Sequence, residues 1–209
     1  GARAQWHAAL QGSRLPHALL VHGLTGLGKG ALAEWIARAS LCEHVERAPC
    51  DTCASCTLHD AGSHPDLRRV YVEVGKKQIA IDDVRELIGA LALKSYRGRR
   101  KVGIVDPADA MNVNGANALL KTLEEPSPDT LLILVVARGD RLPATIASRC
   151  QRLRVAPPTP DVATAWLATQ QRGVDWSGAL ALAGGAPLAA LRLAEGGGGE
   201  LEREMAEWP

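Results

Sequence analysis

One stretch decides the fold of this chain: His17-Ala-Leu-Leu-Val-His-Gly-Leu-Thr-Gly-Leu-Gly-Lys-Gly30. Its apolar residues 18–21 are typical of a short buried strand, and apolar positions recur at helical spacing after residue 30. Between these two patterns, G-x-x-x-x-G-K is complete from Gly23 to Lys29. A glycine-rich loop with a lysine, placed between a strand and a helix, is the context of a phosphate-binding P-loop. We therefore predict an α/β protein with a parallel sheet flanked by helices.

The loop lacks parts that nucleotide hydrolysis needs. The residue after the P-loop lysine should be Ser or Thr, because its hydroxyl ligates magnesium, but this chain has Gly30. Asp106 ends the second buried strand, 102–106, where a nucleotide-binding fold places its magnesium-holding carboxylate. Hydrolysing proteins usually follow it with Glu, which positions the attacking water, whereas here Pro107 follows. Loss of such a base costs about 10² to 10⁴ in rate, so we expect no intrinsic hydrolysis.

Lys29 has two interpretations that the residues leave open. It can still bind an anion, because the loop N–H groups and the helix N-terminus attract phosphate without magnesium. Alternatively the loop is empty or blocked, and Lys29 pairs with Asp106.

The composition leaves few classes of protein open. A chain of 209 residues can bury a substantial core, and we expect one large and one smaller domain. The formal net charge of +1 gives no general attraction to nucleic acid or to an anionic membrane. No apolar run approaches the roughly 20 residues of a membrane span, and no secretory signal pattern opens the chain. We expect a cytoplasmic protein.

Four of the five cysteines are crowded together, as Cys42, Cys50, Cys53 and Cys56. Tetrahedral zinc takes four thiolates, and C-x-x-C turns present paired sulfurs toward one point. Cysteines at intervals of three do not easily pair as disulfides with each other. We therefore predict a structural zinc site in a module of about residues 42–58, with free buried thiols as the alternative. Three nearby histidines are expected to be surface or hydrogen-bonded side chains rather than ligands: His44, His59 and His64.

The remaining patterns give the domain organisation. We expect helices over 3–11 and 81–93, and strands over 66–74, 130–137 and 151–155. Prolines at 157, 158 and 160 mark a linker, and Ala/Leu-rich helical patterns follow over 161–172, 176–184 and 187–194. The predicted domains are an α/β domain over 1–156 and a small helical lid domain over 157–195. Residues 196–209 are expected to be a linker and the start of a truncated third domain.

A basic run, Arg97-Gly-Arg-Arg-Lys101, precedes the strand 102–106. Such a run can contact a DNA phosphate or an anionic partner, but it is more often a solvated loop that enters a strand. We favour the solvated loop.

Two further motifs carry a family resemblance: Asn117-Ala-Leu-Leu-Lys-Thr-Leu-Glu-Glu-Pro126 and Ser148-Arg-Cys150. In this order, with the P-loop and the inserted cysteine module, they resemble the bacterial clamp-loader subunits of the AAA+ family over about residues 15–194. The motor subunits of that family, gamma and tau, keep Lys-Ser/Thr in the P-loop and Asp-Glu after the second strand. The delta-prime family has lost both, and Gly30 and Pro107 make this chain resemble it.

The resemblance points to a third loss. The sensor-2 arginine of the family follows a Gly-Gly-containing turn, and in Gly184-Gly-Ala-Pro-Leu188 its position holds Leu188. Arg192, one helical turn later, is the alternative as a displaced substitute. Three nucleotide-handling groups are then missing. The resemblance thus implies that a vestigial nucleotide site is all that remains at Gly23, Gly28, Lys29 and Asp106.

The arginine of the Ser-Arg-Cys motif is retained as Arg149. In the resembled family it reaches across a subunit interface to the γ-phosphate held by the neighbouring motor subunit. A planar, permanently charged fork of this kind is worth roughly 10³ to 10⁵ in rate. From the residues alone, a surface salt bridge is the simpler interpretation of Arg149. With the resemblance, we favour an arginine finger that acts in trans.

The function that the resemblance implies is that of a scaffold subunit in the DNA polymerase III holoenzyme, a DNA-directed DNA polymerase. Its implied partners are the gamma/tau motor subunits and delta, and indirectly the sliding β-clamp and primer-template DNA. The implied cofactor is structural zinc, with ATP and magnesium not used by this chain. Two alternatives are an ATP-hydrolysing motor subunit and a zinc-ribbon nucleic-acid binder. The second requires steep salt-dependent DNA affinity, which the near-neutral charge does not favour.

Overall fold

The computed structural model describes residues 2–11, 15–97, 99–137, 142–171 and 173–196. The chain divides into two compact units, of which the first is Gly1–His22 with Gly30–Arg154. The second unit combines Gly23–Lys29 with the chain from Val155 onward. The P-loop segment therefore groups with the later helices rather than with the strand before it. Except for Gly196, the predicted third-domain segment 196–209 lies outside the described residues.

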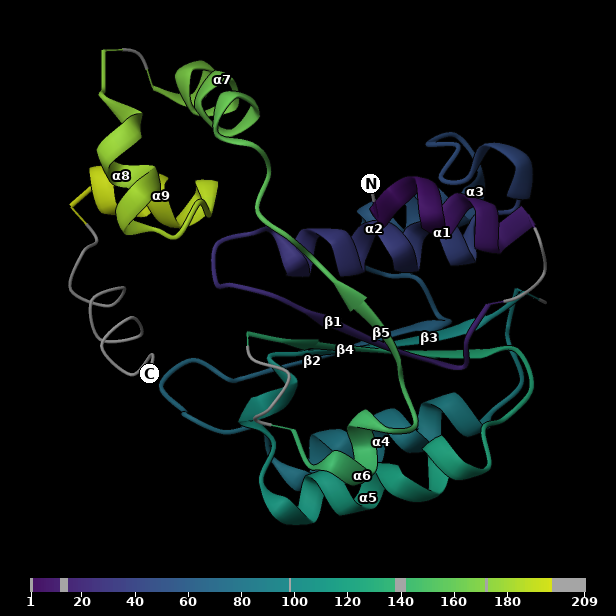
Figure 1. The fold of residues 1–209 in the computed structure, drawn as a ribbon. Helices are drawn as coiled ribbons and strands as arrows, with labels where there is room; N and C mark the ends of the chain where they lie inside the picture. Colours follow the sequence, from purple (N-terminus) through teal and green to yellow (C-terminus); the bar gives the residue numbers. More distant parts are fainter. Residues whose placement is uncertain (1, 12–14, 98, 138–141, 172, 197–209) are drawn as a thin grey trace. The chain divides into compact units, whose positions relative to one another are not determined.

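A five-stranded parallel sheet organises the first unit, in the order β2-β3-β4-β1-β5 (Figure 1). The strands are β1 (Ala18–His22), β2 (Leu67–Tyr71), β3 (Lys101–Asp106), β4 (Thr130–Val136) and β5 (Gln151–Arg154). The three inner strands are buried almost throughout, as parallel strands are when helices cover both faces of a sheet. The two edge strands carry exposed arginines, Arg68 in β2 and Arg152 and Arg154 in β5. The predicted parallel sheet is confirmed.

Helices cover both faces of this sheet (Figure 1). One face carries α1 (Ala2–Gln11) and α2 (Lys29–Leu41), with the short η1 (Val45–Arg47) and α3 (Ala54–Asp60) beside them. The other face carries α4 (Ile81–Ala92), α5 (Val113–Glu124) and α6 (Ala144–Ala147), and η2 (Ala108–Ala110) follows β3. The caps of α5 are local: Asn112 accepts a hydrogen bond from the Gly115 N–H at 2.8 Å, and Pro126 follows the last turn.

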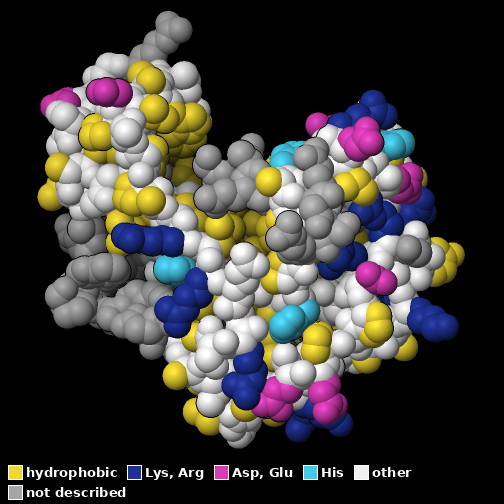
Figure 2. All heavy atoms as spheres, turned by 45° about the vertical axis from the view of Figure 1, so that its right-hand side comes forward, with side chains coloured by type: hydrophobic (Ala, Val, Ile, Leu, Met, Phe, Trp, Pro, Cys, Tyr) yellow, Lys and Arg dark blue, Asp and Glu magenta, His cyan; other side chains and the backbone are white. Residues whose placement is uncertain are grey.

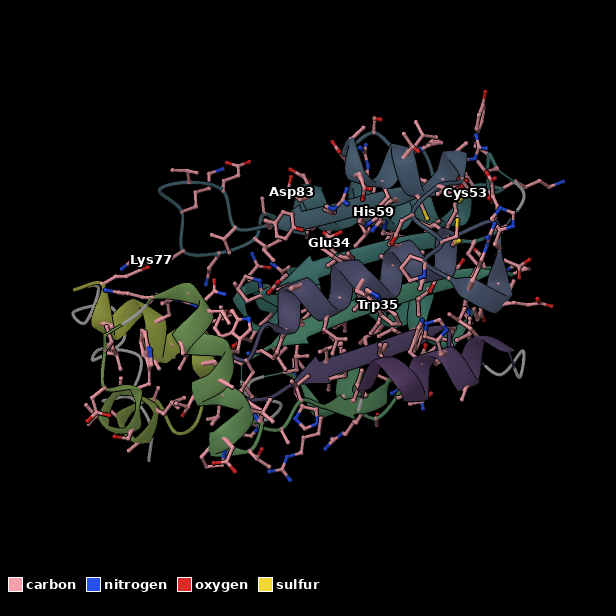
Figure 3. All side chains as sticks on the ribbon, turned by 90° about the horizontal axis from the view of Figure 1, so that it is seen from above. Glu34, Trp35, Cys53, His59, Lys77 and Asp83 are labelled. Atoms are coloured by element: carbon pink, nitrogen blue, oxygen red, sulfur yellow. The ribbon has the colours of Figure 1, made fainter. Side chains whose placement is uncertain are left out.

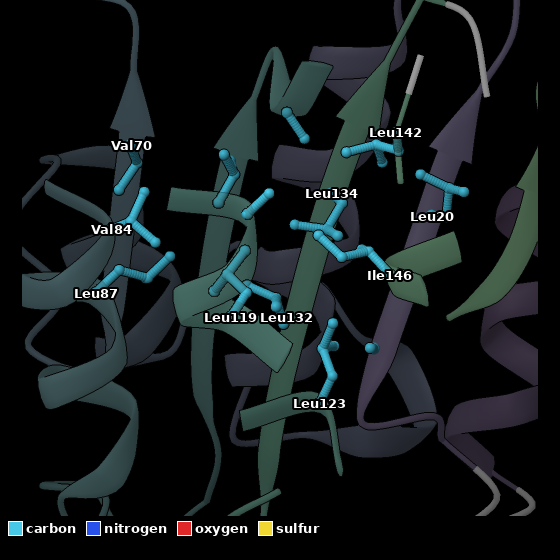
Figure 4. Close-up of a cluster of buried hydrophobic side chains, with 14 of the residues drawn as sticks. Leu20, Val70, Val84, Leu87, Leu119, Leu123, Leu132, Leu134, Leu142 and Ile146 are labelled. Atoms are coloured by element: carbon cyan, nitrogen blue, oxygen red, sulfur yellow. The ribbon is translucent and has the colours of Figure 1, made fainter. Parts of the chain in front are cut away.

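Buried apolar side chains of α4 and α5 form the core on this second face (Figure 4). Leu87 of α4 and Leu119 and Leu123 of α5 pack against the strands, where Leu132 and Leu134 of β4 are buried. Burying one such side chain stabilises the fold by about 1.5–3 kcal/mol. The sheet and its two main covering helices are thus held by apolar contacts.

The second unit has a small core of its own. Its helices are α7 (Pro160–Gln170), α8 (Trp176–Leu182) and α9 (Pro187–Ala194). Trp176 and Leu167 are buried in this core, and Leu27 of the P-loop segment packs against it. None of the helices among the described residues is long and apolar enough to span a membrane alone. Only α8 and α9 taken together meet the length and composition, and they are bent by 115°.

Gly103, in the middle of β3, is required by packing. A Cβ at this position would lie 2.8 Å from Cδ1 of Leu87 and 3.2 Å from Cδ1 of Leu91. We expect Gly103→Ala to lower the free energy of unfolding by about 1–3 kcal/mol through overpacking. Gly89, exposed in α4 with open space around it, is the matched control, and Gly89→Ala should raise stability by about 0.5–1 kcal/mol. Denaturant unfolding measures both, and changes of the same sign would contradict this explanation.

Candidate functional site

The structure brings the four predicted metal ligands together. The Sγ atoms of Cys42, Cys50, Cys53 and Cys56 all lie within 4.8 Å of one another, and those of Cys42 and Cys53 are 3.9 Å apart. A tetrahedron with zinc–sulfur bonds of 2.3 Å has edges of about 3.8 Å. Three of the four cysteines are buried and Cys50 is partly exposed. The donor set and its spacing therefore suit one tetrahedral thiophilic ion.

Backbone N–H groups surround these sulfur atoms. The Cys50 N–H donates to Sγ of Cys42 at 3.4 Å, and the Cys53 N–H to Sγ of Cys50 at 3.3 Å. The backbone N–H of Thr52 lowers the pKa of Cys50 to about 5, because it stabilises the thiolate. Burial acts in the opposite direction and raises the pKa of Cys42 and of Cys56. A bound cation would remove this cost, since it holds all four sulfurs as thiolates.

The cysteine module is tied to the P-loop helix through Glu34 of α2 (Figure 3). The Glu34 carboxylate accepts from Arg69 Nε at 2.7 Å, from Arg69 Nη2 at 2.9 Å and from the Tyr71 hydroxyl at 2.9 Å. His59 of α3 places Nε2 3.0 Å from the same carboxylate. Burial acts to raise the pKa of Glu34, but the hydrogen bonds from His59, Arg69 and Tyr71 outweigh it and lower the pKa to about 2.

A second ion-pair cluster joins the module to the same helix. Arg38 of α2 lies 2.9 Å from Asp51 and 2.5 Å from Asp60, which lie on either side of the last two cysteines. Because Arg38 keeps only about a fifth of its side-chain surface exposed, the pair is partly shielded from solvent.

The basic run 97–101 corrects an expectation. Arg97 donates to Glu43 at 2.6 Å and to the buried Ser55 hydroxyl at 3.2 Å, and Arg99 donates to the carbonyl of Cys42. Lys101 is buried, 3.5 Å from Asp66. The prediction of a solvated loop is therefore wrong for Arg99 and Lys101, which are partly and fully buried, whereas Arg97 is exposed. The acceptors of Arg99 and Lys101 lie far away in the sequence, at Cys42 and Asp66, and a sequence pattern does not reveal them.

The three histidines behave as expected. His44 is exposed, and His59 makes the ion pair with Glu34 described above. His64 is buried, and its Nδ1 accepts from the Asp66 backbone N–H at 3.1 Å. The group of potential ligands among the described residues contains the four cysteines and no histidine.

Groups of the P-loop segment bond to one another and to the start of α9 within the second unit. Nζ of Lys29, which is buried, donates to the loop carbonyl of Leu24 at 2.8 Å. The Leu188 N–H donates to the carbonyl of Gly26 at 3.0 Å. Gly26 has a φ of +83°, and a Cβ there would lie 2.5 Å from the backbone nitrogen of Ala189. Leu188 and Ala189, in the first turn of α9, are thus in contact with the loop.

In the first unit, Asp106 fills the space beside Gly30. A Cβ on Gly30 would lie only 2.6 Å from Oδ2 of Asp106. The carboxylate that holds magnesium in hydrolysing relatives of this fold therefore lies where the side chain of a Ser or Thr would begin. Gly23, Gly28 and Lys29 belong to the other unit.

Arg149 lies just after α6, and its side chain is 37% exposed. Its Nη2 donates to Oε1 of Glu124 at 2.7 Å, and its Nη1 to the Thr145 carbonyl at 2.9 Å. Cys150 packs against the core of the first unit, as expected of a small apolar residue.

The parallel sheet, the P-loop between β1 and α2, and the helical second unit define a P-loop protein of the AAA+ type. The fold of the gamma subunit-related DNA polymerase III protein of Thermotoga maritima agrees with this, with a TM-score of 0.55 at 20% identity over 88% of this chain and 57% of that one. Residues 2–159 match the family described as "DNA polymerase III, delta subunit". The chain belongs to the delta' family of DNA polymerase III subunits.

The relatives named as DNA polymerase III subunit delta' support this assignment. The chain is 43% identical to the one from Pseudomonas aeruginosa over 99% of its own length, and 39% identical to the one from Escherichia coli over 90%. It spans 62% and 58% of the lengths of these two curated relatives. A DNA polymerase III subunit tau/gamma from Haemophilus influenzae is 36% identical over 68% of this chain and 20% of its own length.

Metal removal tests the cysteine site. We expect the purified chain to bind one zinc ion, and Cys56→Ser to lose it and to melt about 5–15 °C lower, because metal binding contributes directly to folding. Cys150→Ser is the matched control, since Cys150 lies outside the cluster, and should keep its zinc. Metal analysis and thermal melting with and without a chelator measure both effects. A chain that binds no zinc at saturating concentration would contradict the assignment.

Restoring a hydroxyl at residue 30 should not restore a magnesium site. We expect Gly30→Ser to change the free energy of unfolding by less than about 1 kcal/mol, because the Asp106 carboxylate that its Cβ would meet is the end of a side chain and can shift. Gly30→Ala carries the same Cβ without the hydroxyl and should behave alike. Titration calorimetry with magnesium and ATP tests binding. Affinity gained by Ser and not by Ala would show that the site is nearly competent.

Proposed function

We propose that this chain is the non-hydrolysing scaffold subunit of a DNA polymerase III clamp loader. In this role it helps to load the sliding β-clamp onto primed DNA and supplies Arg149 in trans to the adjacent motor subunit. The family assignment supports the first part of the proposal. The exposed position of Arg149 next to a core-packed turn supports the second. An arginine finger must be both reachable and held by a rigid element.

The bonds that engage the P-loop lysine and the loop backbone are the observation that carries the proposal. The P-loop lysine is bonded to Leu24 within the loop, and the loop carbonyl of Gly26 is bonded to Leu188 at the sensor-2 position. Gly30 has no hydroxyl, and Pro107 provides no water-positioning carboxylate. A chain without these groups can contribute to hydrolysis only by stabilising the transition state of a neighbouring site.

The proposed partners follow from this role. They are the gamma/tau motor subunits, whose nucleotide Arg149 would contact, and delta, with the β-clamp and primer-template DNA reached through the assembly. The four cysteines would hold structural zinc, since a closed all-thiolate site has no open position for water. Gly23, Gly28, Lys29 and Asp106 are proposed as a vestigial nucleotide site. We place the protein in the cytoplasm, where its DNA partner lies.

The two alternatives are less well supported. A motor subunit needs the hydroxyl and carboxylate that Gly30 and Pro107 replace. A zinc-ribbon nucleic-acid binder needs free basic side chains near the module, but Arg97 and Arg99 are bonded to the module itself. On the face drawn in Figure 2, acidic and basic side chains lie next to one another in several places, which does not produce a single-sign field for phosphate.

Two ATPase measurements test the proposal. The isolated chain should show no magnesium-dependent ATP turnover. In a complex of the full-length protein with its motor and delta subunits, Arg149→Ala should lower the rate of ATP hydrolysis at one motor site by about 10³-fold or more. The complex should still assemble. Arg85→Ala, on the exposed face of α4, is the control for loss of an exposed arginine and should leave hydrolysis unchanged. Turnover by the pure chain, or full activity of the Arg149→Ala complex, would refute the proposal.

A further inference from the structure

We propose that Glu124 is an internal competitor for Arg149. In this proposal, its carboxylate holds the guanidinium within its own chain until a phosphate group on the neighbouring subunit displaces it. The inference rests on the proposed function, in which Arg149 acts in trans, and concerns what governs its availability. It joins two motifs that lie 25 residues apart: Glu124 belongs to Asn117–Pro126 and Arg149 to Ser148–Cys150.

The hydrogen bonds of Arg149 hold its side chain against its own unit. Nη2 lies 2.7 Å from Oε1 of Glu124, a charge-assisted hydrogen bond. Nη1 donates to the Thr145 carbonyl at 2.9 Å and lies 3.5 Å from the Ser148 hydroxyl. Three acceptors of the same chain therefore engage the two terminal nitrogens that a phosphate would use. Part of this arrangement must be given up before Arg149 can bind an external anion.

The position of Glu124 explains why this carboxylate needs a cation. Glu124 is the last residue of α5, and Glu125 is its C-cap. The C-terminal end of a helix carries partial negative charge, so two carboxylates there are electrostatically unfavourable. Arg149 neutralises one of them from the neighbouring turn after α6. An arriving phosphate would meet Glu124 as a repelling charge and would compete with it for the same guanidinium.

The exposure of Arg149 and Glu124 determines how strongly Glu124 competes with phosphate for the guanidinium. The side chains of Arg149 and Glu124 are 37% and 50% exposed, so water and salt weaken the attraction between them. A weak pair of this kind holds the arginine only part of the time. Because apparent affinity falls with the fraction of molecules that are competent to bind, releasing Arg149 should tighten its contact with phosphate by about two- to five-fold.

The test uses the full-length protein titrated into motor and delta subunits, with ATP hydrolysis as the readout. Glu124→Gln removes the charge but keeps the shape of the side chain. It should lower the half-saturating concentration of this chain by about two- to five-fold and leave the maximal rate unchanged. Glu125→Gln is the matched control, because it removes the same charge from the same helix end, and it should leave both values unchanged. The affinity of this chain for the motor and delta subunits, measured with ADP alone, should be the same for Glu124→Gln as for the unchanged protein, since ADP has no γ-phosphate.

The outcomes separate this inference from the proposed function. In the Arg149→Ala background, adding Glu124→Gln must leave the affinity for the motor and delta subunits, measured by binding in the presence of ATP, unchanged, because no guanidinium is left to release. A half-saturating concentration that Glu124→Gln does not lower would overturn the competitor role, while loss of stimulation in Arg149→Ala keeps the proposed function intact. A reduced maximal rate in Glu124→Gln would also overturn it, since the carboxylate would then be positioning the arginine. Full stimulation by Arg149→Ala would refute both.

Discussion

The Glu34 carboxylate is the point at which three parts of the first unit meet. It lies on the P-loop helix α2, it binds Arg69 and Tyr71 of the edge strand β2, and it accepts from His59 of the inserted cysteine module. A half-buried carboxylate with three donors is strongly favoured in its charged form, which its lowered pKa reflects. The cysteine module is therefore held to α2 by side-chain contacts and not only by its chain connections. Its metal ligands are positioned against the same helix that begins at the P-loop lysine.

The basic residues near the module complete this arrangement. Arg38, Arg97 and Arg99 all bind acceptors that the inserted segment or its flanks provide, at Asp51, Glu43 and the carbonyl of Cys42. A buried or half-buried cation is costly without a partner, and so is a buried acceptor without a donor. Loss of the metal would loosen the turns that place these acceptors. An ion bound by the four cysteines would therefore stabilise more than its ligands, because the contacts from α2 and from the segment before β3 depend on the same turns.

The limits of sequence reasoning follow from the distance between interacting residues. The cysteine ligands, the P-loop and the core stripes of α4 and α5 are predictable because each is a short local pattern with one geometric meaning. The contact of Arg99 with Cys42 spans 57 residues, and that of Arg149 with Glu124 spans 25. Charged residues carry no pattern that names a distant partner. The sequence therefore indicates the sites but not the contacts that hold them, and it places Arg99 and Lys101 wrongly in solvent.

The glycine-rich P-loop also has a packing role within the second unit. Gly26 allows the backbone of the loop to approach Ala189, the Gly26 carbonyl accepts the Leu188 N–H, and Leu27 packs on the core of the second unit. These are packing functions, and each requires the glycine-rich loop without requiring a nucleotide. A larger residue at Gly26 would force the loop away from α9. Packing within the second unit thus accounts for Gly26 and Leu27 of this segment, and the motif G-x-x-x-x-G-K is not by itself evidence that ATP binds.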